Sequence, residues 1–174
     1  MEKAKDVAVQ PIPKGYHAIT PWIISKNSIK LIKFLESAFD AEETPYSRVY
    51  NEDGTVGHVE VKIHDSVVML FDARKNWPST PAFIRLYVEN ADQVFERAVK
   101  AGAKPVTEMT KLFFGDRVGR VRDPLGNIWW IQTHIEDIDF KDMEKRAKDP
   151  SMMQAMKYVQ ETLDREVSQS GHNN

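Results

Sequence analysis

The stretch "GDRVGRVRDPLGNIWWIQTH", residues 115–134, contains two runs of alternating side chains separated by turn residues. Asp123, Pro124 and Gly126 suit a tight turn, because aspartate accepts backbone hydrogen bonds, proline restricts φ and glycine adopts positive φ. The alternating runs on either side suit half-buried strands. The stretch is therefore predicted to be a β-hairpin.

Two tryptophans stand side by side in the second strand of this hairpin. Neighbouring side chains in a strand point to opposite faces of the sheet. The length of the turn places Trp129 beside Val121 and Trp130 beside Arg120. Trp129 is therefore predicted to pack in the core with Ile131, whereas Trp130 is predicted to face a cavity.

The hairpin closes the second of two similar halves, each predicted as a strand, a helix and three strands. In the first half these elements are 17–25, a helix over 27–39 that begins at Asn27 or Ser28, 44–52, 57–63 and 66–73. In the second half they are 81–90, a helix over 91–102, 104–109, 115–123 and 127–134. Neither βαβββ unit is large enough to bury its sheet alone, so the repeats, residues 15–73 and 80–138, are predicted to pair.

Two further segments flank the repeats. Residues 1–14 are predicted to be a loose N-terminal arm, and residues 139–174 a helical C-terminal extension. An apolar stripe marks one side of the last helix, made of Met152, Met156, Val159 and Leu163. This helix is expected either to cover an edge of the domain or to swap onto a second subunit, and the stripe favours the first interpretation.

The composition excludes several classes of function. The net charge of −2 provides no general attraction for nucleic acid or for acidic membranes. The chain contains no cysteine, which excludes disulfides, thiol nucleophiles and zinc–thiolate sites. No apolar run is long enough to span a bilayer. A cytoplasmic protein without a nucleic-acid or membrane partner is expected.

Several blocks of the chain resemble the glyoxalase/bleomycin-resistance/dioxygenase superfamily, also called vicinal oxygen chelate, and within it the PhnB-like branch. They are "PWIIS", "FLESAFDA", "GHVEVKIHDSVVML" and "FGDRVGRVRDPLGNIWWIQTHIED". The resemblance covers residues 15–138. It implies an α+β fold in which two βαβββ repeats form curled mixed sheets around a concave cavity, with helices on the convex side.

The resemblance also implies four positions for ligands of a divalent metal ion. These positions hold Ile19, Met69, Phe83 and Trp130. None of these side chains is a ligand for a hard divalent cation. The metal site is therefore predicted to be lost, with no cofactor. A displaced metal site remains the alternative, with His58, Glu60 or His134 as substitute ligands.

The predicted cavity still contains aromatic and charged side chains. If His64 and Asp65 form a two-residue turn, Glu60 pairs with Met69 and lines the cavity. The candidate ligand-binding residues are His58, Glu60, Phe83, Arg85, Tyr87, Arg120, Trp130 and Gln132. Arg85 and Arg120 could bind a carboxylate or phosphonate in bidentate fashion, and His58 with Glu60 could transfer a proton.

Three classes of function are compatible with such a cavity. The first is a protein that binds a small aromatic or anionic molecule without metal. The second is a metal-dependent lyase, isomerase or transferase with a displaced metal site. The third is an interaction module in which the Met-rich C-terminal helix matters and the cavity is filled. The first class is the prediction.

A homodimer is also predicted. The strand over 17–25 carries apolar residues on both faces, with Trp22 and Ile24 expected against the helix and Ile19 and Ile23 toward the cavity. Pro21 interrupts the hydrogen-bonding ladder of this strand, which suits a strand at a seam. Closed two-fold dimers are the commonest homo-oligomers.

Overall fold

The computed structural model of the chain describes residues 9–78 and 80–170. The first half contains β1 (Trp22–Ser25), α1 (Ser28–Phe39), β2 (Glu42–Glu43), β3 (Val49–Tyr50), β4 (Val56–Ile63) and β5 (Ser66–Asp72). The second half contains β6 (Phe83–Tyr87), α2 (Ala91–Lys100), β7 (Lys104–Lys111), β8 (Asp116–Arg122) and β9 (Ile128–His134). The extension forms α3 (Phe140–Arg146) and α4 (Pro150–Ser170). Parts of the predicted arm and extension, residues 1–8 and 171–174, lie outside the described residues.

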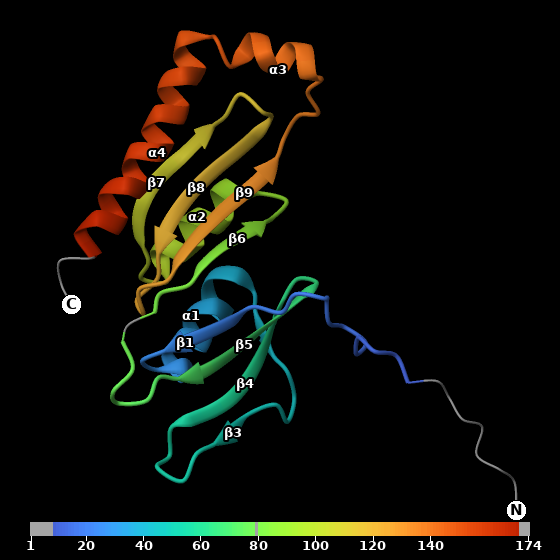
Figure 1. Ribbon diagram of the computed structural model, residues 1–174, viewed down its shortest axis with the longest axis vertical. Coiled ribbons are helices and arrows are strands. Elements are labelled where there is room, and N and C mark those ends of the chain that lie inside the picture. The colour runs from blue at the N-terminus through green and yellow to red at the C-terminus, as the bar shows by residue number, and fades with distance from the viewer. Residues whose placement is uncertain (1–8, 79, 171–174) are drawn as a thin grey trace, which may run out of the picture.

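Each half forms its own mixed sheet. In the first sheet the strand order is β1-β5-β4-β2, with β3 also paired to β4, and in the second it is β6-β9-β8-β7. The outer strands β1 and β6 run parallel to β5 and β9, and all other pairs are antiparallel. The two sheets lie edge to edge, and β1 and β6 form the edges that face each other (Figure 1). This architecture confirms the predicted α+β fold of two βαβββ repeats.

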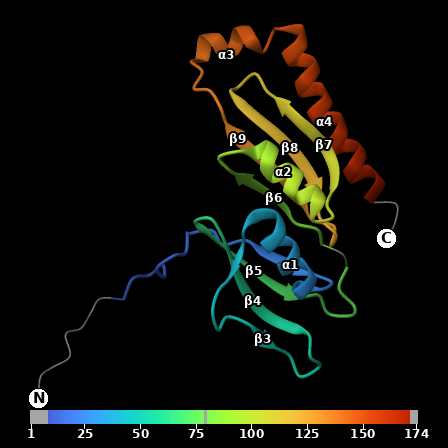
Figure 2. The same ribbon diagram turned by 180° about the vertical axis from the view of Figure 1, so that it is seen from behind.

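One hydrophobic core serves both halves. Helices α1 and α2 lie next to each other on the same side of the two sheets (Figure 2). Leu31, Leu35 and Phe39 of α1 are fully buried in one cluster with Trp129 of β9. The ring centroids of Phe39 and Trp129 are 4.9 Å apart. The two repeats therefore stabilise each other, as their small size requires.

The hairpin formed by β8 and β9 has the predicted register. Arg120 lies opposite Trp130, and Val121 lies opposite Trp129. The carboxylate of Asp123 accepts hydrogen bonds from the backbone of Leu125, at 2.8 Å, and from Trp129 Nε1, at 3.0 Å. Trp129 is fully buried, which confirms its predicted place in the core.

Local signals in the first half were also sufficient to place its elements. Ile63 pairs with Ser66 and Glu60 pairs with Met69, so the two-residue turn at His64 and Asp65 is confirmed. Of the two predicted start residues of α1, the cap is Asn27, whose side chain accepts a 2.8 Å hydrogen bond from the backbone of Lys30. Both features depend on neighbours in the sequence, which explains why a pattern predicts them.

The prediction for the first strand was wrong in extent and in orientation. The strand spans only Trp22–Ser25, because Pro21 has no N–H to donate to the ladder. Ile23 is fully buried on the helix side with Leu70, whereas Trp22 is 60% exposed on the opposite side beside Met69. Ile24 shares the face of Trp22, and Ile19 precedes the strand and is exposed. An apolar run without alternation contains no signal that distinguishes its two faces.

The strand predicted over 44–52 is also different in the structure. Only the two-residue strand β3 lies within this range, β2 ends just before it at Glu43, and Tyr46 between the two strands has a φ of 61°. A left-handed backbone conformation at a non-glycine residue interrupts a strand. In the second half, β7 extends to Lys111, two residues beyond the predicted end.

The extension covers one edge of the second sheet. Helix α4 packs along β7, and Val159 is fully buried there in a small apolar cluster with Leu112 and Val118. Phe114, Trp130, Ala155 and Met156 pack against this cluster. Within residues 9–78 and 80–170, no helix combines the length and apolar character that a membrane crossing requires.

Candidate ligand-binding site

The structure divides the eight predicted site residues between the two sheets. His58 and Glu60 lie on β4 of the first sheet. The other six lie on the second sheet: Phe83, Arg85 and Tyr87 on β6, Arg120 on β8, and Trp130 and Gln132 on β9. The strands β4 and β8 are far apart in the molecule (Figure 1). The single chain therefore presents two clusters, and the expectation that one cavity of this chain unites all eight is corrected.

Trp130 is the centre of the larger cluster. Arg85 is its neighbour on β6 and Arg120 its neighbour on β8. Both guanidinium groups lie over its ring, with their central carbons 4.2 Å and 3.8 Å from the ring centroid, respectively. Within the described part of the chain, neither arginine forms an ion pair with a carboxylate. Two cations therefore share one aromatic ring without a carboxylate at ion-pair distance, although the charge of Asp164 on α4 acts on Arg120.

Arg120 does not line an open cavity as predicted. Only 3% of it is exposed, because α4 lies over it. Its Nη1 donates hydrogen bonds to the carbonyl oxygen of Val159, at 2.6 Å, and to Thr107 Oγ1, at 3.1 Å. Burial, reinforced by the nearby charge of Arg85, lowers the pKa of Arg120 to about 10. The extension thus converts a predicted cavity residue into a covered one.

Arg85 remains accessible on β6. Phe83 and Tyr87, two residues away on either side, are 60% and 56% exposed. Arg85 and Tyr87 also line a cleft of about 460 Å³ at the seam between the sheets, together with Ile19 of the first half. This volume lies in the range of small-molecule sites. An exposed arginine between two aromatic rings is therefore available to a ligand.

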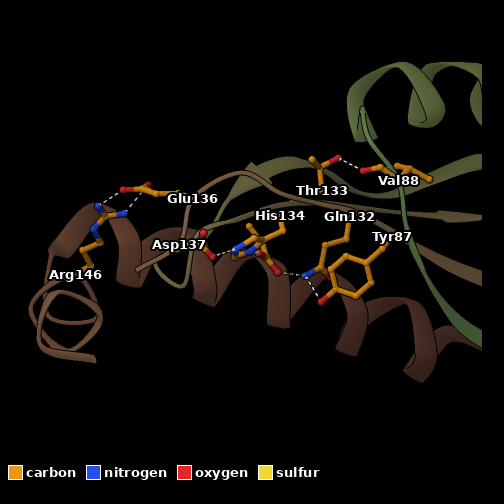
Figure 3. A network of polar contacts seen from close by, with 9 residues as sticks. Tyr87, Val88, Gln132, Thr133, His134, Glu136, Asp137 and Arg146 are labelled. Atoms are coloured by element: carbon orange, nitrogen blue, oxygen red, sulfur yellow. Dashed lines mark hydrogen bonds and ion pairs between the residues drawn. The ribbon is translucent and has the colours of Figure 1, made fainter. Parts of the chain in front are cut away.

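Gln132 connects this strand to a buried carboxylate. Its Nε2 donates hydrogen bonds to the hydroxyl of Tyr87, at 3.1 Å, and to Asp116 (Figure 3). Gln132 and Asp116 are 1% and 5% exposed. Gln132 is consequently a positioning residue for Tyr87 rather than an exposed part of the cavity surface.

The same carboxylate holds His134. Asp116 Oδ1 lies 2.6 Å from His134 Nδ1, and Asp137 Oδ1 lies 3.0 Å from Nε2. Figure 3 shows the imidazole next to Asp137, close to the Gln132–Tyr87 pair. Its hydrogen bonds to Asp137 and Asp116 raise the pKa of His134 above its ordinary value. This favours the imidazolium form, which binds no metal ion.

The smaller cluster surrounds Glu60. Its carboxylate accepts a 2.6 Å hydrogen bond from the hydroxyl of Tyr16 and lies 3.2 Å from His58 Nε2. The bond to Glu60 raises the pKa of Tyr16. The rings of His58 and Trp22 lie 6.5 Å apart. This group can bind or transfer a proton, but it is in the other sheet from the paired arginines.

The four positions that the resemblance assigns to metal ligands do not suit a divalent cation. Met69 contacts the indole nitrogen of Trp22, and Trp130 lies next to two guanidinium groups that would repel a cation. Ile19 and Phe83 have no donor atom. No group of three or more histidine, aspartate or glutamate side chains suited to a metal ion occurs within residues 9–78 and 80–170. The proposed substitutes His58, Glu60 and His134 accordingly do not form one ligand set in this chain.

The sequence prediction missed several residues of these clusters. Tyr16 precedes the first strand, and Thr107 and Val159 contact Arg120 from β7 and α4. No local pattern marks them, because each contact joins residues at least thirteen positions apart. Asp116 lies within the predicted hairpin, but its bonds to Gln132 and His134 depend on the register of β8 and β9.

Comparison with solved structures supports the fold. TioX from Micromonospora sp. ML1 has a TM-score of 0.57 and 20% identity, and the match covers 68% of this chain and 99% of that one. The PhnB protein from Bacillus cereus has a TM-score of 0.51 and 19% identity, with coverage of 69% and 100%. FosX, a fosfomycin resistance protein from Listeria monocytogenes, has a TM-score of 0.53 and 15% identity, with coverage of 73% and 97%.

Sequence comparisons extend this similarity. An uncharacterized protein of Mycobacterium bovis is 31% identical in an alignment of 138 positions, with coverage of 73% of this chain and 90% of that protein. An uncharacterized protein of Mycobacterium tuberculosis is equally similar, with 80% of its length covered. Residues 17–131 match the family model described as Glyoxalase/Bleomycin resistance protein/Dioxygenase superfamily. The chain therefore belongs to the glyoxalase/bleomycin resistance protein/dioxygenase superfamily.

Proposed function

We propose that this protein binds a small anionic molecule that carries an aromatic group, and that it has lost the metal site of its superfamily. The observation that carries the proposal is the pair Arg85 and Arg120 on Trp130, two cations that form no ion pair with a carboxylate in the described part of the chain. Buried or crowded charges are normally paired, so an anionic ligand would complete this cluster. The expectation of a cytoplasmic protein is part of the same proposal.

The exposed part of the cluster provides the recognition chemistry. Arg85 can donate two parallel hydrogen bonds to a carboxylate or phosphonate. Phe83 and Tyr87 flank it on the same face of β6 and can contact an aromatic ring of the ligand. The seam cleft beside Arg85 has room for such a molecule.

Isothermal titration with phenylphosphonate tests this proposal, because the compound joins an aromatic ring to a tetrahedral anion. The expected result is binding that Arg85→Gln weakens by about tenfold or more, since a hydrogen bond to a charged group is lost. Arg74→Gln is the matched control: Arg74 lies 5.6 Å from the ring of Trp77, and this pair follows β5 of the other sheet. Equal affinity in wild type and Arg85→Gln would refute the assignment.

The alternative function is a metal-dependent lyase, isomerase or transferase with a displaced metal site. One observation favours it: Glu60 is only 9% exposed and is paired with His58 and Tyr16 rather than with a lysine or arginine. Elemental analysis of protein purified without chelators distinguishes the two functions. About one metal ion per chain, lost in Glu60→Gln, would establish the alternative and overturn the claim of a lost metal site.

We also propose that the protein is a homodimer. Large apolar side chains remain exposed on the faces of the two sheets that point away from α1 and α2, among them Trp22, Phe83 and Tyr87. A second copy related by a two-fold axis could cover both faces at once. Light scattering at micromolar concentration is expected to report twice the mass of the chain. A monomer at that concentration would overturn this part of the proposal.

A further inference from the structure

Helix α4 occupies the face of the second sheet that carries the paired arginines. It lies outside residues 17–131, the part of the chain that matches the family. The hydroxyl groups of Thr107 and Thr162 lie 2.7 Å apart, and Tyr158 Oη accepts a 3.0 Å hydrogen bond from the backbone of Glu108. These contacts join α4 to β7 (Figure 1), and the hydrogen bond from Arg120 to Val159 places the helix next to Arg120.

The central contact of this helix with the site is polar. The carbonyl oxygen of Val159 accepts the 2.6 Å hydrogen bond from Arg120, and the hydroxyl of Thr162 approaches the same oxygen at 3.2 Å. A carbonyl oxygen carries only part of a negative charge. Hydrogen bonds from a guanidinium group to an anionic oxygen are stronger than those to a neutral one. An anionic oxygen in direct contact is therefore a better hydrogen-bond partner for Arg120 than the carbonyl of Val159 is.

Unused hydrogen-bonding groups surround the same contact. Arg120 Nε, Trp130 Nε1 and Gln132 Oε1 are buried and have no hydrogen-bond partner within the described residues. Arg120 and Gln132 are each more than nine-tenths buried. Buried polar atoms in proteins are nearly always paired. The docked helix consequently leaves unsatisfied two donors and one acceptor that a polar ligand could engage.

We propose that α4 is an intramolecular competitor for the anion site. The carbonyl of Val159 takes the position at Arg120 that an anionic oxygen of the ligand takes in the bound state, so helix docking and full ligand binding exclude each other. This inference rests on the proposed function, because it concerns the regulation of the same site. The apparent affinity then depends on the fraction of molecules in which α4 is displaced.

A reversible cross-link tests the competition in the full chain. The sequence contains no cysteine, so Thr107→Cys/Thr162→Cys introduces one disulfide that holds α4 on β7. The two hydroxyl groups are close enough for the replacing sulfur atoms to bond. Phenylphosphonate is expected to bind the oxidised protein at least about tenfold more weakly than the same protein after reduction.

A second variant loosens the helix without a cross-link. Tyr158→Phe removes one hydrogen bond of α4 to β7 and is expected to increase the affinity for phenylphosphonate about fivefold. Gln160→Ala, at an exposed position of the same helix, is the control and should leave the affinity unchanged. Phenylphosphonate should also accelerate amide hydrogen exchange of α4 in the wild-type protein.

The outcomes separate the two proposals. Equal binding before and after reduction, or unchanged affinity in Tyr158→Phe, would overturn the competition and leave the anion site in place. Absence of binding in wild type, reduced double variant and Tyr158→Phe alike would overturn the proposed function, and the competition with it. If the double variant does not fold, hydrogen exchange decides, because slower or unchanged exchange in α4 on binding contradicts the inference.

Discussion

Replacement of Trp129 by alanine should come close to unfolding this protein. The side chain is fully buried, packs on Phe39 at 4.9 Å and so connects the core of β9 to α1 of the other repeat. Truncation of a buried tryptophan costs roughly 3–5 kcal/mol, because the cavity collapses only partly. Its Nε1 also donates to the buried carboxylate of Asp123, and loss of this donor adds about 1 kcal/mol.

The neighbouring position provides a matched comparison. Trp130 is only partly buried and lies beneath two guanidinium groups, so Trp130→Ala should cost roughly 1–2 kcal/mol of contacts. The free energy of unfolding of a domain of this size is about 5–15 kcal/mol, so of these substitutions only Trp129→Ala removes enough stability to approach unfolding. Trp129→Phe keeps most of the ring and should lose roughly 1–2 kcal/mol, chiefly the bond to Asp123.

Urea denaturation followed by far-ultraviolet circular dichroism measures these differences, and it avoids a fluorescence signal that the substitutions themselves change. Trp129→Ala should unfold at a clearly lower urea midpoint than Trp130→Ala and Trp129→Phe, with a similar dependence on urea in all three variants. Equal and large losses in Trp129→Ala and Trp130→Ala would refute the reasoning. Trp130 would then belong to the core, and the face that it occupies could not serve as a binding site.

Three further predictions concern the second sheet and the extension. The hydrogen bonds of His134 to Asp137 and Asp116 raise its pKa above the ordinary value of 6.5. These bonds therefore stabilise the fold fully at a pH below 6.5, and the stabilisation is lost as the pH rises through the raised pKa. The melting temperatures of wild type and His134→Gln should therefore differ more at about pH 5.5 than at about pH 8.5. Arg146 and Lys111 lower the pKa of Glu136 to about 2. The ion pair between Glu136 and Arg146 of α3 should therefore persist above pH 4.5 and weaken as the pH falls toward 2, and NMR line shapes of α3 can follow this change. Gly119→Ala should destabilise the fold by roughly 1–3 kcal/mol in urea, because the added Cβ meets Met109 and Phe95, and an unchanged midpoint would contradict this.

Much of the fold follows from local signals in the sequence. The hairpin of β8 and β9 has its predicted register because Asp123 and Gly126 determine the turn, and the turn determines which residues face each other. With the register known, alternation assigns Trp129 to the core. The repeated order of strand, helix and three strands likewise needs only the spacing of apolar residues and short connections.

The sequence by itself did not determine the faces of β1 or the surroundings of Arg120. Ile23 faces the core because β1 pairs with β5 in a register that the apolar sequence of β1, which does not alternate, could not predict. Arg120 became buried because α4 returns across the sheet and brings Val159 to it, a contact between residues 39 positions apart. The repeats already assigned His58 and Glu60 to one half and Arg85 and Trp130 to the other, but only the tertiary structure decided that the two sheets keep these groups apart instead of joining them in one cavity. Turn chemistry and alternation act between near neighbours in the chain, whereas the cover of a sheet face depends on the packing of distant segments, which no local pattern encodes.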